Sequence, residues 1–419
     1  MLIEFQVGNF RSFREPQTLS MVASSFSDHE ANTFDPKLSG FGRFVRSAGI
    51  YGPNAAGKTN LLLALQFVQG FVVNSASATP GRALPYQPFK LSKRTRFEPS
   101  TFQVSLVHNG IRYEYGFSMN AMQICEEWLV EYVNPRGRKL FERKFNEKKK
   151  SYDWNFSSLL KGQRSVWRDA TRPEVLFLSR ATQLNSEQLL PVYEWFQKRL
   201  VVVVGITTMN PNLTLQLLGQ PEGKEKLLPF LKEADLGITG VEVKREKIPQ
   251  GAGQMFVVGS GFVEPGPTGV PENVVRLTFS HGQGKDAVGF DISEESAGTQ
   301  ALFRTAGAWM NVLENGEVLL IDEIDTSLHP KLVQFLIGKF HSKETNSKNA
   351  QLIFTTHNTS LLNQDMFRRD QFWFVEKSRE GSSTLYPLTD FKTRNDEALE
   401  RWYMRGKYGA LPILGQNDR

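Results

Sequence analysis

The sequence predicts an α/β protein built on a mainly parallel sheet. Three observations predict this fold. A glycine-rich loop near residue 55 lies between an apolar strand and an amphipathic helix, a second apolar strand near residue 320 ends in Asp-Glu, and a third near residue 355 ends in histidine. Continuous apolar runs are typical of parallel strands covered on both faces. Because ligands bind at the carboxyl ends of such strands, the three polar endings indicate one shared site.

The first of these elements is the stretch AGIYGPNAAGKTNLLLAL, residues 48–65. Its glycines let the backbone curl so that several N–H groups converge on phosphate oxygens, and the helix N-terminus adds positive potential. An ordinary glycine-rich turn is the alternative, but the strand before and the helix after favour a phosphate-binding loop. We expect Lys58 to bridge the β- and γ-phosphates of a nucleotide and the Thr59 hydroxyl to ligate Mg²⁺. The expected loop contacts with the nucleotide are Asn54, Ala55, Ala56, Gly57, Lys58, Thr59 and Asn60.

The second element is GEVLLIDEIDTSLHP, residues 316–330. The apolar run 318–321 reads as a buried strand with Asp322 at its carboxyl end, where it can hold Mg²⁺ through water. Glu323 points elsewhere and is free to orient or deprotonate an attacking water. Pro330 is placed to start the helix 331–341.

The third element, QLIFTTHN, is a buried strand that ends in His357. A lone histidine in this position is more often structural. The two preceding elements favour a functional role, because a neutral histidine can donate a hydrogen bond to a γ-phosphate oxygen.

A further stretch, EESAGTQ at residues 294–300, follows a strand-like run and opens a helical pattern. Taken alone, it predicts a helix start with Ser296 as the N-cap. Its position in the sequence, between the glycine-rich loop and the Asp-Glu strand, allows a second interpretation, in which the turn contributes to a nucleotide site.

The order of these elements resembles the heads of ABC-type ATPases of the SMC and RecF kind. The resemblance implies an SMC/RecF-like P-loop ATPase head that binds ATP and Mg²⁺, in which SAGTQ corresponds to a signature motif that is usually Ser-Gly-Gly-Gln. Ser296 and Gly298 would then cap the γ-phosphate held by a second subunit, so that two ATP molecules are sandwiched in a dimer. Ala297 and Thr299 depart from the usual motif, whereas Gly298 keeps the turn.

The N-terminal stretch NFRSF, residues 9–13, strengthens this resemblance, which implies that Arg11 approaches the nucleotide. The family also has a glutamine in a loop after the first helix. Gln87 fits best by position, and Gln183 is the alternative.

A closer resemblance covers nearly the whole chain. It rests on the stretches YEYGF, LFERKF, ESAGTQALF, DEIDTSLHP, FTTHN, RRDQFWFVEK and YGALP. Together they resemble the stand-alone ABC-type ATPases of the RloA/AbiL type, cousins of the OLD family. The resemblance implies anti-phage defence in abortive-infection and restriction-linked loci, with a separately encoded effector that is often a nuclease.

The chain is predicted to divide into four segments. Residues 1–145 form a first lobe with the glycine-rich loop and a β-rich insert, and 146–273 form a mainly helical insert with a Gly- and Pro-rich loop at 248–273. Residues 274–395 form a second α/β lobe, and 396–419 form a tail. The 236 residues between Thr59 and Ser296 lack sustained heptads, which excludes a long coiled coil.

The composition limits which binding partners and which cellular location are expected. A net charge of +6 favours anionic partners only mildly, and the basic runs 148–150 and 244–247 read as solvated faces. A single cysteine, Cys125, suits a reducing cytoplasm, and no apolar stretch is long enough to span a bilayer. We expect a cytoplasmic homodimer or higher oligomer that senses either nucleic acid or a partner protein.

Three other functions compete with this prediction. A RecF- or SMC-like DNA-binding ATPase in repair or recombination is the main alternative. A self-contained nuclease is disfavoured because only 62 residues follow His357 and none of them forms Asp-x-Asp. A transporter ATPase suits neither the long insert nor the NFRSF start.

Overall fold

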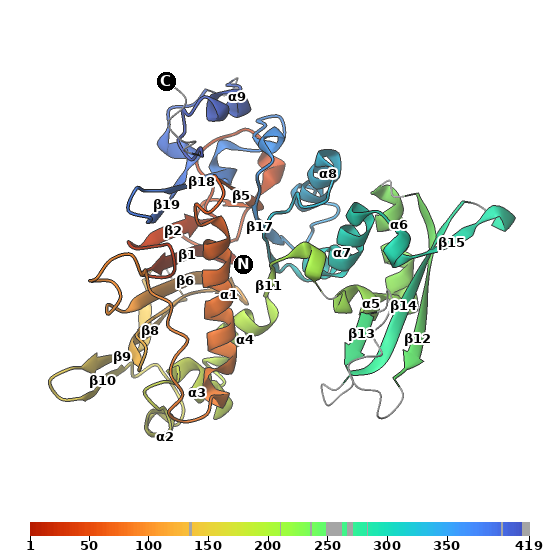
Figure 1. Cartoon of the computed structure of the whole chain (residues 1–419). Coiled ribbons are helices and arrows are strands. Elements are labelled where there is room, and N and C mark those ends of the chain that lie inside the picture. Colours follow the sequence, from red (N-terminus) through yellow and green to blue (C-terminus); the bar gives the residue numbers. More distant parts are fainter. Residues whose placement is uncertain are drawn as a thin grey trace.

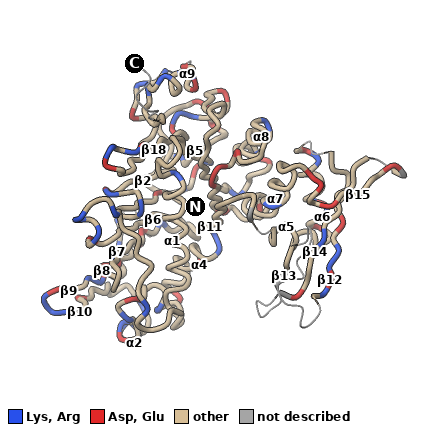
Figure 2. The backbone as a smooth tube through the Cα atoms, viewed as in Figure 1, with Lys and Arg blue, Asp and Glu red and all other residues tan. Residues whose placement is uncertain are grey.

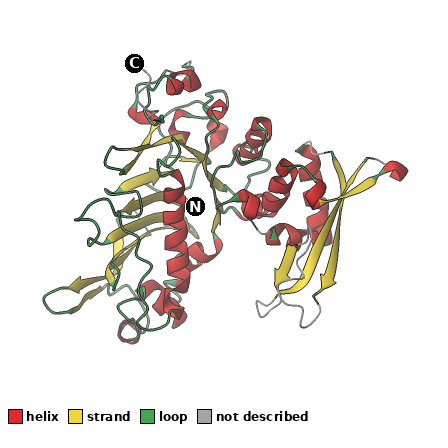
Figure 3. Cartoon of the chain, in the orientation of Figure 1, coloured by secondary structure: helices red, strands yellow, loops and turns green. Residues whose placement is uncertain are grey.

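The computed structural model describes residues 1–133, 136–209, 211–234, 237–248, 262–265, 271–282, 284–394 and 397–412. Two large sheets and a long helix form one body. A smaller β-sheet lies to one side of it, and a group of helices lies between the two (Figures 1 and 3). No helix within the described residues is long and apolar enough to cross a membrane.

The central sheet has six strands in the order β11-β16-β17-β5-β18-β19, and every pair is parallel except β18 with β19. The apolar runs predicted to be buried strands lie here, and all four residues of β16 are buried. The strands are β11 (Leu200–Val203), β16 (Val318–Ile321), β17 (Gln351–Thr355), β5 (Ser47–Tyr51), β18 (Phe372–Lys377) and β19 (Ser383–Pro387).

The second large sheet is antiparallel, with the order β10-β9-β8-β7-β6-β1-β2. Its sequences alternate apolar and polar residues because one face packs on the core and the other meets solvent. The strands are β1 (Leu2–Gly8), β2 (Gln17–Ser20), β6 (Ser100–His108), β7 (Ile111–Met119), β8 (Ile124–Tyr132), β9 (Arg138–Asn146) and β10 (Ser151–Phe156), while β3 (Thr33–Phe34) and β4 (Phe44–Val45) pair separately.

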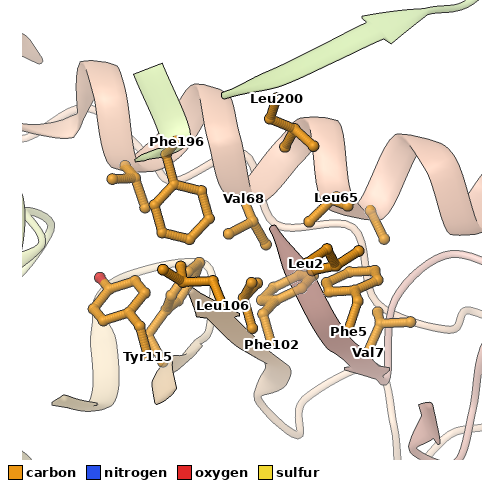
Figure 4. Close-up of a cluster of buried hydrophobic side chains, with 14 of the residues drawn as sticks. Leu2, Phe5, Val7, Leu65, Val68, Phe102, Leu106, Tyr115, Phe196 and Leu200 are labelled. Carbon is orange, nitrogen blue, oxygen red and sulfur yellow. The ribbon is translucent and has the colours of Figure 1, made fainter. Parts of the chain in front are cut away.

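Helix α1 (Lys58–Asn74) links the two sheets through a shared core. Its residues Leu61, Leu65, Val68 and Val72 recur at helical spacing and are buried. They meet side chains from both sheets and from α4 (Leu190–Lys198), as Figure 4 shows. Helices α2 (Arg164–Asp169) and α3 (Phe177–Gln183) lie near the end of α1 that is remote from the glycine-rich loop. The first turn of α1 is therefore fixed relative to both sheets.

A second core lies on the other side of the central sheet, where α7 (Ala297–Asn315) and α8 (Pro330–His341) pack. Helices α5 (Asn212–Leu218) and α6 (Pro221–Glu233) connect α7 to a four-stranded sheet, in which β12 and β13 flank β14 and β15 pairs with β14. These strands are β12 (Ile238–Lys247), β13 (Phe262–Pro265), β14 (Pro271–His281) and β15 (Val288–Asp291). Near the C-terminus, α9 (Leu399–Met404) packs its Tyr403 into the second core.

The predicted segment 146–273 carries α2–α6 between residues 164 and 233, and it also contributes strands to three sheets. The Gly- and Pro-rich loop predicted at 248–273 lies mostly outside the described residues, apart from β13 and the first residues of β14. The four-part division of the chain stays a prediction.

Candidate functional site

The glycine-rich loop joins β5 to α1, as the sequence predicts, and its backbone allows no larger side chains at two positions. Gly52 has a φ of 152°, and a Cβ there would collide with the carbonyl oxygen of Val375 in β18. Gly57 has a φ of 116° and lies against the hydroxyls of Ser12 and Ser383. Ala55 has a φ of 61°, which an L-residue adopts only where the surrounding structure requires it. The loop is thus held in a tight curl by β18, β19 and the N-terminal segment.

Lys58, the first residue of α1, is 5% exposed. Its Nζ donates to the carbonyl oxygens of Gly52 at 2.8 Å and Pro53 at 3.1 Å, and it lies 3.0 Å from Nε2 of His357. Burial lowers the pKa of Lys58 to about 8, against the opposing effect of nearby carboxylates. The ammonium is therefore hydrogen-bonded to the same loop that is predicted to bind the phosphates.

Asp322 follows β16 and connects the end of this strand to the end of β17 and to the first turn of α1. Its carboxylate accepts hydrogen bonds from Thr59 Oγ1 at 2.9 Å and from Thr355 Oγ1 at 2.7 Å. Asp322 is 9% exposed. Carboxylate and hydroxyl oxygens are the ligands that Mg²⁺ prefers, and the 2.9 Å separation of Thr59 Oγ1 and Asp322 Oδ2 suits two oxygens facing one small cation. These donors fit Mg²⁺ at this point.

Glu323 adopts a φ of 49°, an uncommon value outside glycine. Its backbone N–H donates to Thr355 Oγ1 at 2.7 Å. This turn takes the side chain away from Asp322 and leaves it 53% exposed, with Oε1 at 3.9 Å from His357 Nε2. The two neighbouring carboxylates thus face different surroundings, as the sequence predicts.

His357 lies two residues beyond the end of β17. Burial lowers its pKa, and the positive charge of Lys58 lowers it further. A neutral imidazole with its Nε2 lone pair toward Lys58 accounts for the 3.0 Å contact. Together with Gly52, Pro53 and Asn54, His357 also lines a cavity of about 620 Å³.

Arg11 and Gln87 meet beside the first turn of α1. The Arg11 backbone N–H donates to the Gln87 carbonyl at 2.8 Å, and Arg11 Nε donates to Gln87 Oε1 at 2.8 Å. A longer contact of 3.4 Å joins Arg11 Nη1 to Asn60 Oδ1. All three side chains line a cavity of about 390 Å³. Gln183, the alternative glutamine, is exposed on α3 and accepts from Arg180, so the structure brings Gln87 and not Gln183 to the predicted site.

Ser296 caps helix α7, accepting from the Thr299 N–H at 3.1 Å. The conventional N-cap geometry predicted for this residue is therefore present. Gly298 lies so close to the Ser327 carbonyl oxygen that a Cβ would be 2.9 Å from it. Within the described part of the chain, the side-chain hydroxyl of Ser296 hydrogen-bonds only with Thr299, and no hydrogen bond of Ser296 reaches residues 52–60 of the same subunit.

Several residues at this site escaped sequence reasoning. Thr355 contacts both Asp322 and the backbone of Glu323, and Thr356 Oγ1 donates to Asp325 Oδ1 at 2.6 Å. Ser383 donates through its hydroxyl to the Ala56 carbonyl and through its backbone N–H to the Ser12 carbonyl. The two threonines sit inside the motif FTTHN and were open to prediction, whereas Ser383 carries no local signal.

Residues 47–363 match the family described as "AAA domain, putative AbiEii toxin, Type IV TA system". The chain belongs to this family. The match runs from β5 through the Asp-Glu end of β16 to just beyond His357. In this AAA-domain protein the matched range therefore includes the glycine-rich loop, Asp322, Glu323 and His357, but not Arg11, Ser12 or Ser383.

Among solved structures, this AAA-domain protein is similar to three SMC head structures. They are an SMC head bound to the C-terminal winged-helix domain of ScpA (15% identity, TM-score 0.41, 92% of this chain and 96% of the other), the SMC head domain from Thermotoga maritima (15%, 0.38, 92% and 98%) and a Pyrococcus furiosus SMC head with an extended coiled coil bound to the C-terminal domain of ScpA (14%, 0.38, 93% and 97%). Likeness at this level supports no argument about partners. No curated protein matches the sequence.

The fold is that of an ABC-type P-loop ATPase head, as the sequence predicts. The glycine-rich loop between β5 and α1, the Asp-Glu end of β16 beside it, and the antiparallel sheet that shares a core with α1 are the features that carry this assignment.

Proposed function

We propose that the protein hydrolyses ATP as a dimer and acts as a nucleotide-driven switch in anti-phage, abortive-infection defence, where it controls a separately encoded effector such as a nuclease. Its chemistry is the conversion of ATP and water to ADP and phosphate. The cytoplasm is the expected location.

The observation that carries the chemical part is the hydrogen-bond network around Asp322. Thr59, Asp322 and Thr355 come from α1 and two strand ends, and they hold two oxygen ligands together for Mg²⁺, which would offset phosphate charge when bound. Thr355 also fixes the backbone of Glu323, whose exposed carboxylate is free to take a proton from water. Lys58 and the N-terminus of α1 bind phosphate. Once Lys58 turns from His357 Nε2 toward the phosphate oxygens, the neutral imidazole donates to the same oxygens in its Nε2–H tautomer.

The dimer is supported by the character of the SAGTQ turn. Ser296 uses its oxygen to cap α7, and its bonding involves no residue of the loop 52–57 in its own subunit. A helix N-terminus with a hydroxyl and a glycine is suited to an anionic group. In the proposed assembly that group is the γ-phosphate bound by a second copy, which makes each site composite.

The defence role is supported by the family description, which names an AbiEii toxin and a type IV toxin–antitoxin system, and by the resemblance to RloA/AbiL-type ATPases. The alternative is a DNA-binding ATPase in repair or recombination, which the SMC and RecF resemblance favours. An effector gene beside this one is expected for the defence role and not for the alternative.

The catalytic assignment is tested by Glu323→Gln. We expect unchanged ATP binding and hydrolysis slowed by about 10²- to 10⁴-fold, because the amide cannot accept the proton of the attacking water. Glu314→Gln, an exposed change on α7 that removes only a surface ion pair with Lys226, is the control and should hydrolyse ATP normally. Normal turnover in Glu323→Gln would show that the base lies elsewhere.

A further inference from the structure

Residues 90–98 form a loop that we call the basic loop, and its outer side chains are almost all cationic or apolar. Lys90, Lys93, Arg94 and Arg96 are exposed. Leu91 is 68% exposed and Phe97 is 85% exposed. Figure 2 shows Lys and Arg along this loop, which projects beside β6. Exposing an apolar ring among cations is unfavourable in water, so this composition calls for an explanation.

Buried polar side chains beneath the basic loop hold its backbone in place through hydrogen bonds. The Asn9 side chain donates to the carbonyls of Thr95 at 2.8 Å and Glu98 at 2.7 Å, and it accepts from the Phe89 N–H at 3.0 Å. Asn9 is 6% exposed, and Thr95, 2% exposed, donates through its hydroxyl to the Phe89 carbonyl. These bonds fix the backbone while the charged and apolar side chains face outward. A preorganised loop loses less entropy on binding than a flexible one.

The cations of this loop join others from a neighbouring segment. Leu91 lies against Gly381 in the turn between β18 and β19. Lys377 ends β18, and Arg379 lies in this turn. Arg94 is partly neutralised by Glu98 at 3.3 Å and Glu15 at 3.9 Å. The other cations have no carboxylate within ion-pair distance among the described residues; they are Lys90, Lys93, Arg96, Lys377 and Arg379. Five unbalanced positive charges around an exposed ring make a surface for a polyanion that has aromatic groups.

We propose that the basic loop binds single-stranded nucleic acid, with its phosphodiesters on the cations and an unpaired base stacked on Phe97. Stacking on an exposed aromatic requires a base that is free of its duplex partner. A short loop lacks the helix or β-ribbon that enters the major groove of a duplex, which favours a single strand.

The loop is also connected to the candidate nucleotide site. Lys90 and Lys377 line the same cavity as Arg11 and Gln87, and Arg11 bonds to Gln87 just before the loop begins. A strand lying on the basic loop would thus contact the segment that holds Arg11. This inference goes beyond the proposed function, and it is tested by binding alone, without any measurement of hydrolysis.

The test uses the full-length protein and fluorescence anisotropy with a labelled oligothymidine, an oligouridine and a duplex of equal length, at several salt concentrations. The double variant Lys93→Glu/Arg96→Glu should weaken binding of the single strands at least tenfold. It should also reduce the slope of log affinity against log salt by about 1.4, because each lost phosphate contact contributes about 0.7. Comparison of the two single strands shows whether the sugar matters.

The matched control is Lys148→Glu/Lys150→Glu, which makes the same change in net charge on the β9–β10 hairpin. It should bind nearly as the wild type does. Phe97→Ala should weaken single-strand binding about tenfold, leave the salt slope unchanged and not affect the duplex, because a neutral stacking contact is lost. Unchanged ATP binding confirms that each variant is folded.

Three results would overturn the proposal. One is the absence of single-strand binding by the wild type, another is equal loss in the hairpin control, and the third is duplex binding as tight as single-strand binding with no effect of Phe97→Ala. The first result would leave a protein partner as the occupant of this surface.

Discussion

Among single residues, Lys58 combines near-complete burial with a positive charge at the nucleotide site. Its ammonium is nearly inaccessible and faces two carbonyls and a neutral imidazole, and burial lowers its pKa to about 8. The charged form is the one that attracts phosphate, so the protonation of this residue and the binding of a polyphosphate are linked.

This linkage predicts the pH dependence of nucleotide affinity. Well below pH 8 Lys58 is charged and adds no pH dependence of its own to the affinity. Above pH 8 the free protein has lost the proton and must take it up on binding, so affinity should fall by up to about tenfold per pH unit until the higher pKa of the bound state is reached. Calorimetric titration with a non-hydrolysable ATP analogue in buffers of different ionisation enthalpy measures both affinity and proton uptake.

Lys58→Arg is the control for this measurement, because guanidinium stays charged across the range. Its affinity should be lower but flat with pH, and Lys58→Ala should bind no nucleotide measurably. A wild-type affinity that does not change above pH 8 would contradict the linkage.

At the scale of elements, the end of β17 organises the site more than the sequence suggested. Thr355 donates to Asp322 and accepts from the N–H of Glu323, so one hydroxyl sets the relation between the two carboxylates. In this scheme Thr355 contacts neither the nucleotide nor the attacking water, so it is a positioning residue.

Thr355→Val keeps the shape of this side chain and removes both hydrogen bonds. Leaving the Glu323 N–H and the Asp322 oxygen without this partner should cost about 1–3 kcal/mol of folding free energy. Hydrolysis should fall about 10- to 100-fold through misplacement of Glu323, while ATP affinity changes little. Thr355→Ser retains the hydroxyl and should restore hydrolysis, and a valine variant with normal turnover would remove Thr355 from the positioning scheme.

The elements that the sequence predicted well are those whose signal is local. The loop between β5 and α1 and the strand 318–321 follow from glycine spacing and apolar runs, and both lie where predicted. Contacts that join distant segments had no such signal. Ser383 reaches the Ala56 carbonyl from the opposite end of the chain, and the positive φ of Glu323 depends on Thr355 in another strand. The roles of the site residues stay predictions until they are measured.

At the scale of the whole molecule, the role of Ser296 depends on assembly. It is either a simple helix cap or half of an ATP site shared by two subunits. As a cap, Ser296→Arg should lower the free energy of unfolding by about 1 kcal/mol and leave activity per folded subunit intact. In a composite site it should abolish hydrolysis while each subunit still binds ATP.

Mixing Ser296→Arg subunits with Lys58→Ala subunits distinguishes the two. A heterodimer pairs one intact loop with one intact signature turn, so a composite site predicts that ATPase activity reappears in the mixture. Each variant alone is the control and should be inactive. Heterodimers demonstrated by mass measurement that show no recovered activity would count against the composite arrangement.

The packing of the glycine-rich loop also bears on how the chain is made. The backbone of Ala56 is held by Ser383, 327 residues further along, and Gly52 rests against Val375. Contacts so distant in sequence form late, because the intervening chain must first be ordered. During synthesis, which proceeds from the N-terminus, the loop would emerge early but stay without its supporting walls until β18 and β19 leave the ribosome. A nascent chain would therefore gain the ability to bind a nucleotide only when its synthesis is nearly complete.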